Sequence, residues 1–136
     1  MNIAVTGGAG FIGSHIVEKL VGRGDKVIVI DNLSTGKKEN LKAVWNKIDF
    51  LEMDIRNFDL LKTKLKNIDG IFHEAALASV QDSFVNPEEY HDVNVNGTEN
   101  IFKLAKEFGF KVVYASSSSV YGNPIKIPIN EESEKN

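Results

Sequence analysis

Three regularly spaced glycines near the N-terminus could bind phosphate groups. Gly7, Gly10 and Gly13 follow a short apolar stretch, residues 3–6, and precede a helical pattern. Gly8 offers a second interpretation, in which it replaces Gly7 as the first glycine of the motif. Glycine lets the backbone turn tightly beside a pyrophosphate, and the next helix then directs free N–H groups at the anion. The segment therefore predicts the phosphate-binding part of a dinucleotide site.

A carboxylate follows where such a site needs one. Asp31 ends the aliphatic run 27–30, about twenty residues after Gly10. Its carboxylate could accept hydrogen bonds from both ribose hydroxyls of an adenosine, and it would repel a 2′-phosphate. NAD is therefore expected rather than NADP. Lys37 and Lys38 could offset the repulsion, although a solvated loop accounts for them better.

Two further strand ends carry candidate contacts. Asp54 follows the stretch 48–53, where its side chain could reach the adenine amino group or could instead cap a helix or turn. Both interpretations remain open. Small or apolar residues follow the stretch 70–73 and would let a dinucleotide approach the backbone: Ala75, Ala76 and Leu77. Ligands of parallel sheets bind at this carboxyl edge.

Strands and helices that alternate along the chain must position these residues. The runs that favour strands are 3–6, 27–30, 48–53, 70–73 and 111–115. The helical patterns are 13–23, 39–45, 58–65 and 87–108. Such alternation is typical of right-handed βαβ units and a parallel sheet. We expect an α/β fold with a Rossmann-type doubly wound sheet in the order 3-2-1-4-5.

The composition excludes several other classes of protein. The 136 residues are 42% hydrophobic and 26% charged, with a net charge of −3 and no cysteine. A chain without cysteine forms no disulfide and no thiolate site. The acidic balance argues against nucleic acid as a partner, and no apolar run approaches the ~20 residues of a membrane span. The three histidines are not at metal-ligand spacing, so we expect no metal. Because the sequence has no cysteine and no apolar run of membrane length, the expected location is cytoplasmic.

Six segments together resemble the extended short-chain dehydrogenases/reductases, and in particular their nucleotide-sugar epimerase/dehydratase branch. They cover almost the whole chain in the family's order and spacing: 6–15, 31–36, 54–56, 73–76, 94–98 and 116–122. The resemblance implies that backbone N–H groups of Phe11 and Ile12 bind the pyrophosphate. It implies that Asp54 and Ile55 hold the adenine. The ribose would be held by Asp31 and the loop after it, which contains Asn32, Ser34, Thr35 and Gly36.

The same resemblance assigns roles further along the chain. Asn94 would support the active-site helix beside the cofactor. Ser117, four residues before Tyr121, stands in the place of the family's catalytic Ser/Thr and would hydrogen-bond a sugar hydroxyl. Its hydroxyl could instead satisfy a carbonyl at the strand end. Ser118 and Ser119 stand where the dehydratases of this branch carry acidic residues, which favours an epimerase.

One element of the family's chemistry has no counterpart in the sequence. The general base is a tyrosine followed four residues later by lysine, and none of Tyr90, Tyr114 and Tyr121 has such a lysine. We therefore expect residues 1–136 to be the N-terminal NAD-binding part of a larger enzyme, with an incomplete sheet and no substrate domain. The part alone is expected to be inactive.

The function implied by the resemblance is that of a nucleotide-sugar 4-epimerase of the UDP-glucose/UDP-galactose type. Such an enzyme oxidises C4 of the sugar transiently and returns the hydride to the other face. The alternatives are a dehydratase or reductase of the same branch, or a module that binds NAD without catalysis. A homodimer is a further expectation. We also expect apolar surface at the uncovered strand 111–115, and hence self-association or marginal stability.

Overall fold

The computed structural model describes residues 1–135, so Asn136, the last residue of the expected domain, lies outside the described part. It contains one five-stranded parallel sheet in the order β3-β2-β1-β4-β5, as the sequence predicts. The strands are β1 (Asn2–Thr6), β2 (Lys26–Asp31), β3 (Ile48–Glu52), β4 (Gly70–His73) and β5 (Lys111–Tyr114). All pairs are parallel and in regular register, for example Val5 beside Val29 and Phe72.

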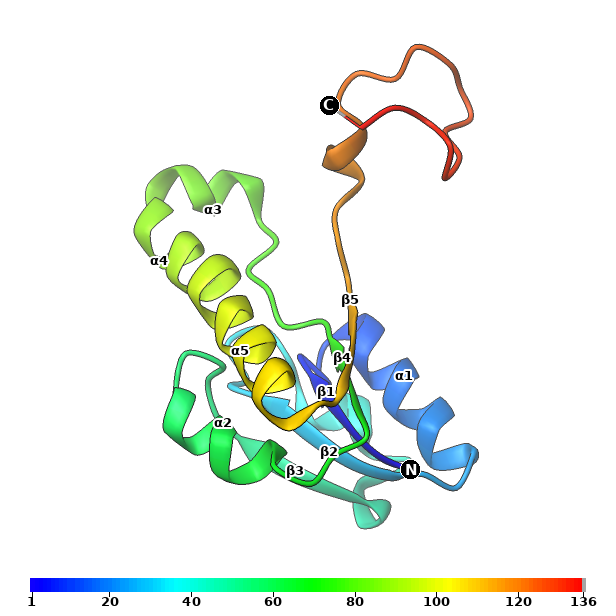
Figure 1. Ribbon diagram of the computed structural model, residues 1–136, viewed down its shortest axis with the longest axis vertical. Helices are drawn as coiled ribbons and strands as arrows, with labels where there is room; N and C mark the ends of the chain where they lie inside the picture. Colours follow the sequence, from blue (N-terminus) through cyan, green and yellow to red (C-terminus); the bar gives the residue numbers. More distant parts are fainter. Residues whose placement is uncertain (136) are drawn as a thin grey trace.

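Helices cover the two faces of the sheet unequally (Figure 1). Helix α1 (Phe11–Gly22) lies on one face, and α2 (Phe58–Leu65) and α5 (Thr98–Phe108) lie on the other. Alternation along β1 divides the core accordingly. Ile3 and Val5 pack on the α1 side, whereas Ala4 packs among residues of α2 and α5. Both faces of the central strands are therefore buried, which suits their aliphatic sequences.

Two helical expectations need correction. Helix α1 begins at Phe11 rather than at Gly13, which brings its first free N–H groups closer to the glycine turn. The stretch 39–45 forms two short 3-10 turns, η1 (Lys38–Leu41) and η2 (Trp45–Lys47), instead of a helix. Only Leu41 and Val44 of this stretch are buried, so too little apolar surface is available to stabilise a longer helix.

The stretch 87–108 is helical throughout but has three parts. Helix α4 (Pro87–His91) continues into a π turn, η3 (Asp92–Gly97), and then into α5, which ends at Gly109 in the left-handed conformation. A short helix that the sequence did not predict, α3 (Val80–Val85), precedes them. The π turn holds one extra residue per turn, and such turns concentrate at functional sites.

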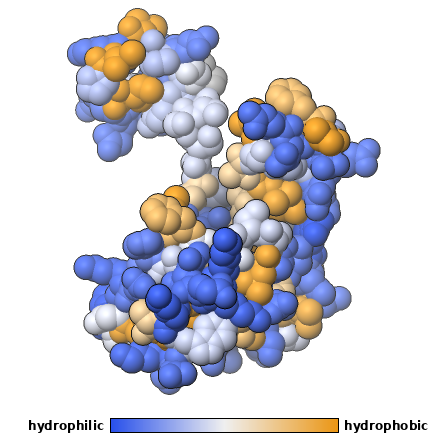
Figure 2. Space-filling model, turned by 180° about the vertical axis from the view of Figure 1, so that it is seen from behind, coloured by the Kyte–Doolittle hydropathy of each residue, from blue (hydrophilic) through white to orange (hydrophobic). Residues whose placement is uncertain are grey.

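The segment after β5 stands away from the rest of the molecule (Figures 1 and 2). It contains the 3-10 turn η4 (Ser118–Tyr121). Figure 2 shows apolar side chains on its surface, where Ile125 and Ile127 are 92% and 83% exposed. The predicted apolar surface at β5 is also present, since Val113 and Tyr114 are about half exposed.

Candidate functional site

The glycine turn between β1 and α1 closes on itself through its backbone. Gly7 has φ +65°, and the Gly10 N–H donates to its carbonyl at 3.0 Å. A Cβ on Gly7 would lie 2.7 Å from the nitrogen of Ala75, and one on Gly13 would overlap the Gly7 carbonyl. Gly8 packs against β2 instead, because its Cβ would lie 2.6 Å from Val29. The turn thus has no room for a side chain at Gly7, Gly8 or Gly13, and both interpretations of the motif share Gly10 and Gly13.

The carboxylate of Asp31 is anchored at the end of β2. It is buried, and it accepts hydrogen bonds from the backbone N–H of Ala9 at 2.9 Å and of Leu33 at 2.8 Å. Gly36 leaves room beside it, since a Cβ there would lie 2.8 Å from one carboxylate oxygen. An ionised carboxylate offers about four acceptor positions, so two remain for the hydroxyls of a diol.

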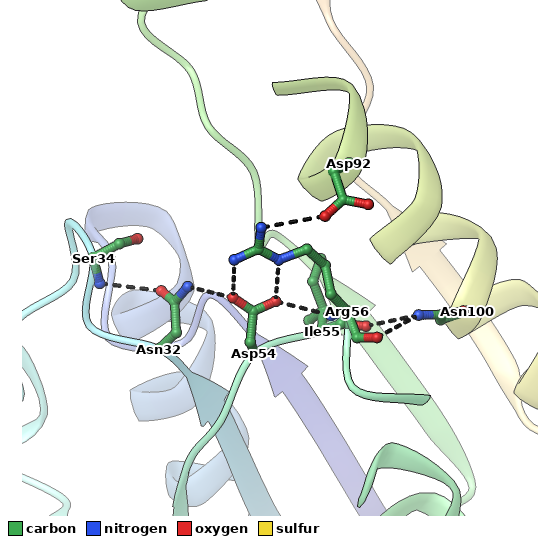
Figure 3. Close-up of polar contacts among 7 residues, drawn as sticks. All are labelled: Asn32, Ser34, Asp54, Ile55, Arg56, Asp92 and Asn100. Carbon is green, nitrogen blue, oxygen red and sulfur yellow. Dashed lines mark hydrogen bonds and ion pairs between the residues drawn. The ribbon is translucent and has the colours of Figure 1, made fainter. Parts of the chain in front are cut away.

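The base end of the site is a network around Asp54 (Figure 3). The Arg56 side chain forms a fork with the Asp54 carboxylate, with N···O distances of 3.0 and 2.8 Å. Asn32 donates to the same carboxylate at 3.0 Å. Hydrogen bonds from Arg56 are the main cause that lowers the pKa of Asp54 to about 2. The carboxylate is therefore ionised at neutral pH.

Helix α2 begins at its own cap, so Asp54 is not the N-cap of that helix. Asn57 is the N-cap, and its side chain accepts from the Leu60 N–H at 3.2 Å. The Asp54 side chain instead stabilises the turn before it, by accepting from the Arg56 backbone N–H at 2.8 Å.

The far end of the site is built by the loop after β4. Its backbone passes directly beside Gly7, where only glycine fits. The Asn94 side chain, in the π turn, bonds both backbone groups of Leu77: its amide donates to the carbonyl at 2.9 Å, and its oxygen accepts from the N–H at 2.8 Å. The π turn thus fixes the loop at Leu77.

A buried histidine joins the strand ends beneath this loop. His73 Nδ1 lies 2.6 Å from Thr6 Oγ1, and its Nε2 lies 2.9 Å from Thr98 Oγ1. Burial lowers the pKa of His73 to about 4, so the ring is neutral at neutral pH. A neutral ring has one donor and one acceptor, and hydroxyl groups can complement both. The network connects β1, β4 and α5 directly below the glycine turn.

These parts surround one cavity of about 300 Å³ at the carboxyl edge of the sheet. Most of the residues expected to bind a cofactor line it: Gly7, Gly10, Phe11, Ile12, Gly13, Asp31, Asn32, Ser34, Thr35, Asp54, Ile55, Ala75, Ala76 and Leu77. The two other expected residues, Gly36 and Asn94, do not line the cavity. Gly36 packs against Asp31, and Asn94 bonds Leu77.

Sequence reasoning missed four residues of the lining: Ile30, Met53, Glu74 and Val93. Ile30, Met53 and Glu74 are neighbours of predicted site residues at strand ends, a position that could have identified them. Burial raises the pKa of the Glu74 carboxyl. Val93 reaches the cavity from the π turn, which no sequence pattern indicated.

Ser117 lies apart from this cavity, among the exposed residues after β5. Its hydroxyl oxygen accepts from the Ser119 N–H at 3.2 Å and caps the turn η4. In this contact the hydroxyl oxygen accepts a hydrogen bond, whereas the alternative expected the hydroxyl to donate to a carbonyl at the strand end. Among residues 1–135, no group of histidine, cysteine or acidic residues could hold a metal ion. Within the same residues, no helix has the length and apolarity to cross a membrane.

The geometry fits a dinucleotide. A glycine turn that a Cβ would fill lies at a helix N-terminus, where a pyrophosphate binds. Asp31, which has free acceptor positions, lies beside that turn at the end of β2. The Asp54 network follows β3, the next strand on that side, and closes this end of the cavity. The loop of small residues at β4 leaves space on the opposite side.

Comparison with known proteins agrees with this geometry. A putative UDP-glucose 4-epimerase of Methanocaldococcus jannaschii is 45% identical over 132 residues, which are 95% of this chain and 42% of that protein. UDP-glucuronic acid decarboxylase 1 of Arabidopsis thaliana is 44% identical over 131 residues, 96% of this chain and 29% of that protein. The chain thus spans less than half the length of these relatives.

Solved structures of sugar-nucleotide epimerases are also similar to this chain. UDP-glucose 4-epimerase from Stenotrophomonas maltophila, with bound NAD, superposes with a TM-score of 0.91 at 31% identity, over all of this chain and 43% of that one. UDP-N-acetylglucosamine 4-epimerase from Methanobrevibacter ruminantium has a TM-score of 0.89 at 41% identity, over 99% of this chain and 44% of that one. The model of the NAD dependent epimerase/dehydratase family matches residues 3–136, and the chain belongs to this family.

Proposed function

We propose that this chain is the NAD-binding portion of a nucleotide-sugar 4-epimerase of the UDP-glucose/UDP-galactose type. The cavity carries the proposal, because it combines the glycine turn, the free acceptor positions of Asp31 and the open loop at Ala75–Leu77. NAD, when bound, would supply the hydride acceptor for oxidation at C4 of the sugar. The relatives that are named 4-epimerases support this assignment.

The residues of the chain would divide the work of binding. Phe11 and Ile12 would present the free N–H groups of α1 to the pyrophosphate. Asp31, with Asn32 and the loop after it, would hold the adenosine ribose. Asp54 and Ile55 would hold the adenine. Asn94 would keep the loop at Leu77 in place through the two hydrogen bonds described above.

Ser117 is proposed as the group that would hydrogen-bond the reacting sugar hydroxyl. Its exposed hydroxyl follows β5 at the carboxyl edge of the sheet, the edge where the cavity opens. Ser118 and Ser119 cannot act as carboxylate acids or bases, which favours epimerisation over dehydration. The nucleotide sugar would be the substrate of the full-length protein, with a homodimer and a cytoplasmic location as further parts of the proposal.

A second function of the same branch has direct support. The Arabidopsis relative is named a UDP-glucuronic acid decarboxylase and is as similar to this chain as the epimerase relatives are. Both reactions would use the same cofactor site, so the difference would lie in residues that contact the sugar. The full-length protein of this proposal should interconvert UDP-galactose and UDP-glucose. Release of carbon dioxide from UDP-glucuronate would favour the decarboxylase.

Calorimetric titration of residues 1–136 tests the cofactor site itself. We expect saturable NAD binding and weaker NADP binding, because Asp31 repels a 2′-phosphate. We also expect no conversion of UDP-galactose, because no tyrosine of the sequence is paired with lysine four residues later. Folded protein that binds neither dinucleotide would contradict the proposal, and turnover by the chain alone would contradict its inactivity.

A further inference from the structure

The Asp54 carboxylate has all of its acceptor positions filled by donors of the protein (Figure 3). One oxygen accepts from the backbone N–H of Arg56 at 2.8 Å and from its Nε at 3.0 Å. The other accepts from Arg56 Nη2 at 2.8 Å and from Asn32 Nδ2 at 3.0 Å. An ionised carboxylate accepts about four hydrogen bonds. An adenine amino group can therefore bond Asp54 only by replacing one of these donors.

Three of the four donors belong to Arg56, which is held from several sides. Its Nη1 lies 3.3 Å from the carboxylate of Asp92, at the start of the π turn. Its backbone carbonyl accepts from the Asn100 side chain at 3.2 Å, and the same amide donates to the Ile55 carbonyl at 3.1 Å. Moving Arg56 would therefore break contacts with both the π turn and α5.

The fourth donor, Asn32, is held much less firmly. It is an exposed residue of the loop after β2, on the side of Asp54 opposite Arg56 in Figure 3. Its other side-chain contact is the Ser34 N–H, which donates to Asn32 Oδ1 at 3.1 Å. The Asn32 amide is therefore the donor that can leave at least cost.

We infer that Arg56 is a positioning residue for base recognition: it fixes three acceptor positions of Asp54 and leaves the fourth to the planar amino group of a bound adenine. This inference rests on the proposed NAD-binding function. The Asn32 amide fills the fourth position until the base arrives. Both donors are planar NH₂ groups, so the exchange loses no hydrogen bond, and it releases Asn32 toward the ribose.

The dinucleotide that carries hypoxanthine in place of adenine tests this role, because a carbonyl replaces the amino group. The chain should bind NAD at least about tenfold more tightly than this analogue, since the carbonyl of the analogue would face the ionised Asp54 carboxylate, acceptor against acceptor, where the adenine amino group donates. In Arg56→Gln the two side-chain hydrogen bonds of the fork are lost and only the backbone N–H of residue 56 still bonds the carboxylate, so the preference should fall to about threefold or less. Arg56→Lys, which keeps the charge without the fork, should show the same loss.

Two controls separate this role from a general effect on the fold. Arg23→Gln removes another arginine–aspartate pair, with Asp25 outside the cavity, and should keep the tenfold preference. Asn32→Ala should bind both dinucleotides less well yet keep the preference, because both carry the same ribose. Equal binding of the two by the parent chain, or an undiminished preference in both Arg56 variants, would overturn the inference. Failure of both dinucleotides to bind would overturn the proposed function as well.

Discussion

The carboxylate of Asp31 accepts a hydrogen bond of 2.9 Å from the backbone N–H of Ala9. Asp31 ends β2 and Ala9 lies within the glycine turn, so the candidate ribose ligand and the candidate phosphate-binding turn are held together before any ligand binds. Binding then needs little ordering of the protein, which lowers its entropic cost.

Replacing Asp31 by Asn should reduce NAD affinity and weaken the preference over NADP. The amide can accept only on its oxygen, so its NH₂ group would face a backbone donor, either of Ala9 or of Leu33. We expect at least about tenfold weaker NAD binding, because charge-assisted hydrogen bonds are lost. Titration with NAD and NADP measures both effects. Asp49→Asn, an equal charge change at an exposed position of β3, should leave both affinities unchanged.

Two glycines of α1 should respond oppositely to alanine. Gly13→Ala should lower the free energy of unfolding by about 1–3 kcal/mol, because its Cβ would lie 2.8 Å from the carbonyl carbon of Gly7 and from the Cα of Gly8. Gly22→Ala has open space around its Cβ and should raise that free energy by up to about 1 kcal/mol. Urea denaturation of both variants measures the difference. A Gly13→Ala variant as stable as the parent chain would contradict the close packing of the turn.

The His73 network should make stability depend on pH. Burial lowers the pKa of His73 from 6.5 to about 4, so the unfolded chain binds the proton first as pH falls. The free energy of unfolding should therefore decrease by about 2 kcal/mol between pH 7.5 and pH 5. Asp54, with a pKa of about 2, loses its stabilising effect only below pH 4. Urea denaturation across this range measures the slope.

The control for His73 must exclude a second, partly buried group whose pKa is also shifted. Burial raises the pKa of Glu74, so protonation of Glu74 favours the folded state and opposes the effect of His73. The comparison is therefore made in the Glu74→Gln background. There His73→Asn should be less stable at pH 7.5 and should lose most of the dependence between pH 7.5 and 5. An unchanged slope would assign the effect to other groups.

Two asparagines of the π turn offer a matched comparison. Asn94 bonds the N–H and the carbonyl of Leu77, whereas Asn96 donates only to Asp92 on the surface. Asn94→Ala should release the loop, increase amide hydrogen exchange at Leu77 and weaken NAD binding severalfold. Asn96→Ala should change neither. Protection of the Leu77 amide that survives in Asn94→Ala would show that the loop is held by other contacts.

The sequence predicted the strands because most of them are apolar runs bounded by turns, and it predicted their order because strands alternate with helices, as in a doubly wound sheet. It also predicted most of the cavity, since Gly7, Asp31 and Asp54 follow three such runs and parallel strands bring their carboxyl ends to one edge. The π turn could not be predicted in this way. Its hydrogen-bond pattern depends on tertiary contacts, among them the close approach of Gly97 to the Ile55 side chain.

The role of Asp54 shows where sequence reasoning ends. A carboxylate after β3 suits both a base contact and a local cap, and the sequence leaves both open. The structure adds that Arg56 and Asn32 occupy the carboxylate and that Asn57 caps α2. These contacts depend on how two loops and the π turn meet, and no single segment contains that information.

The uncovered edge of the sheet should cause self-association. β5 pairs only with β4 among the described residues, and Val113 and Tyr114 on it are 53% and 50% exposed. An open strand with apolar side chains is a template for pairing with another copy. Sedimentation velocity over a range of concentrations should show oligomers of the parent chain. Val113→Lys should shift the distribution to monomers, because a charged side chain on an edge strand disfavours pairing.

The control distinguishes the sheet edge from apolar surface in general. Val80 on α3 is 71% exposed, more than Val113, but lies outside the sheet. Val80→Lys should therefore leave the oligomers intact if backbone pairing along β5 drives association. If both variants become monomeric, α3 takes part in the contact as well. A parent chain that stays monomeric at every concentration would show that its edge strand is protected despite its exposure.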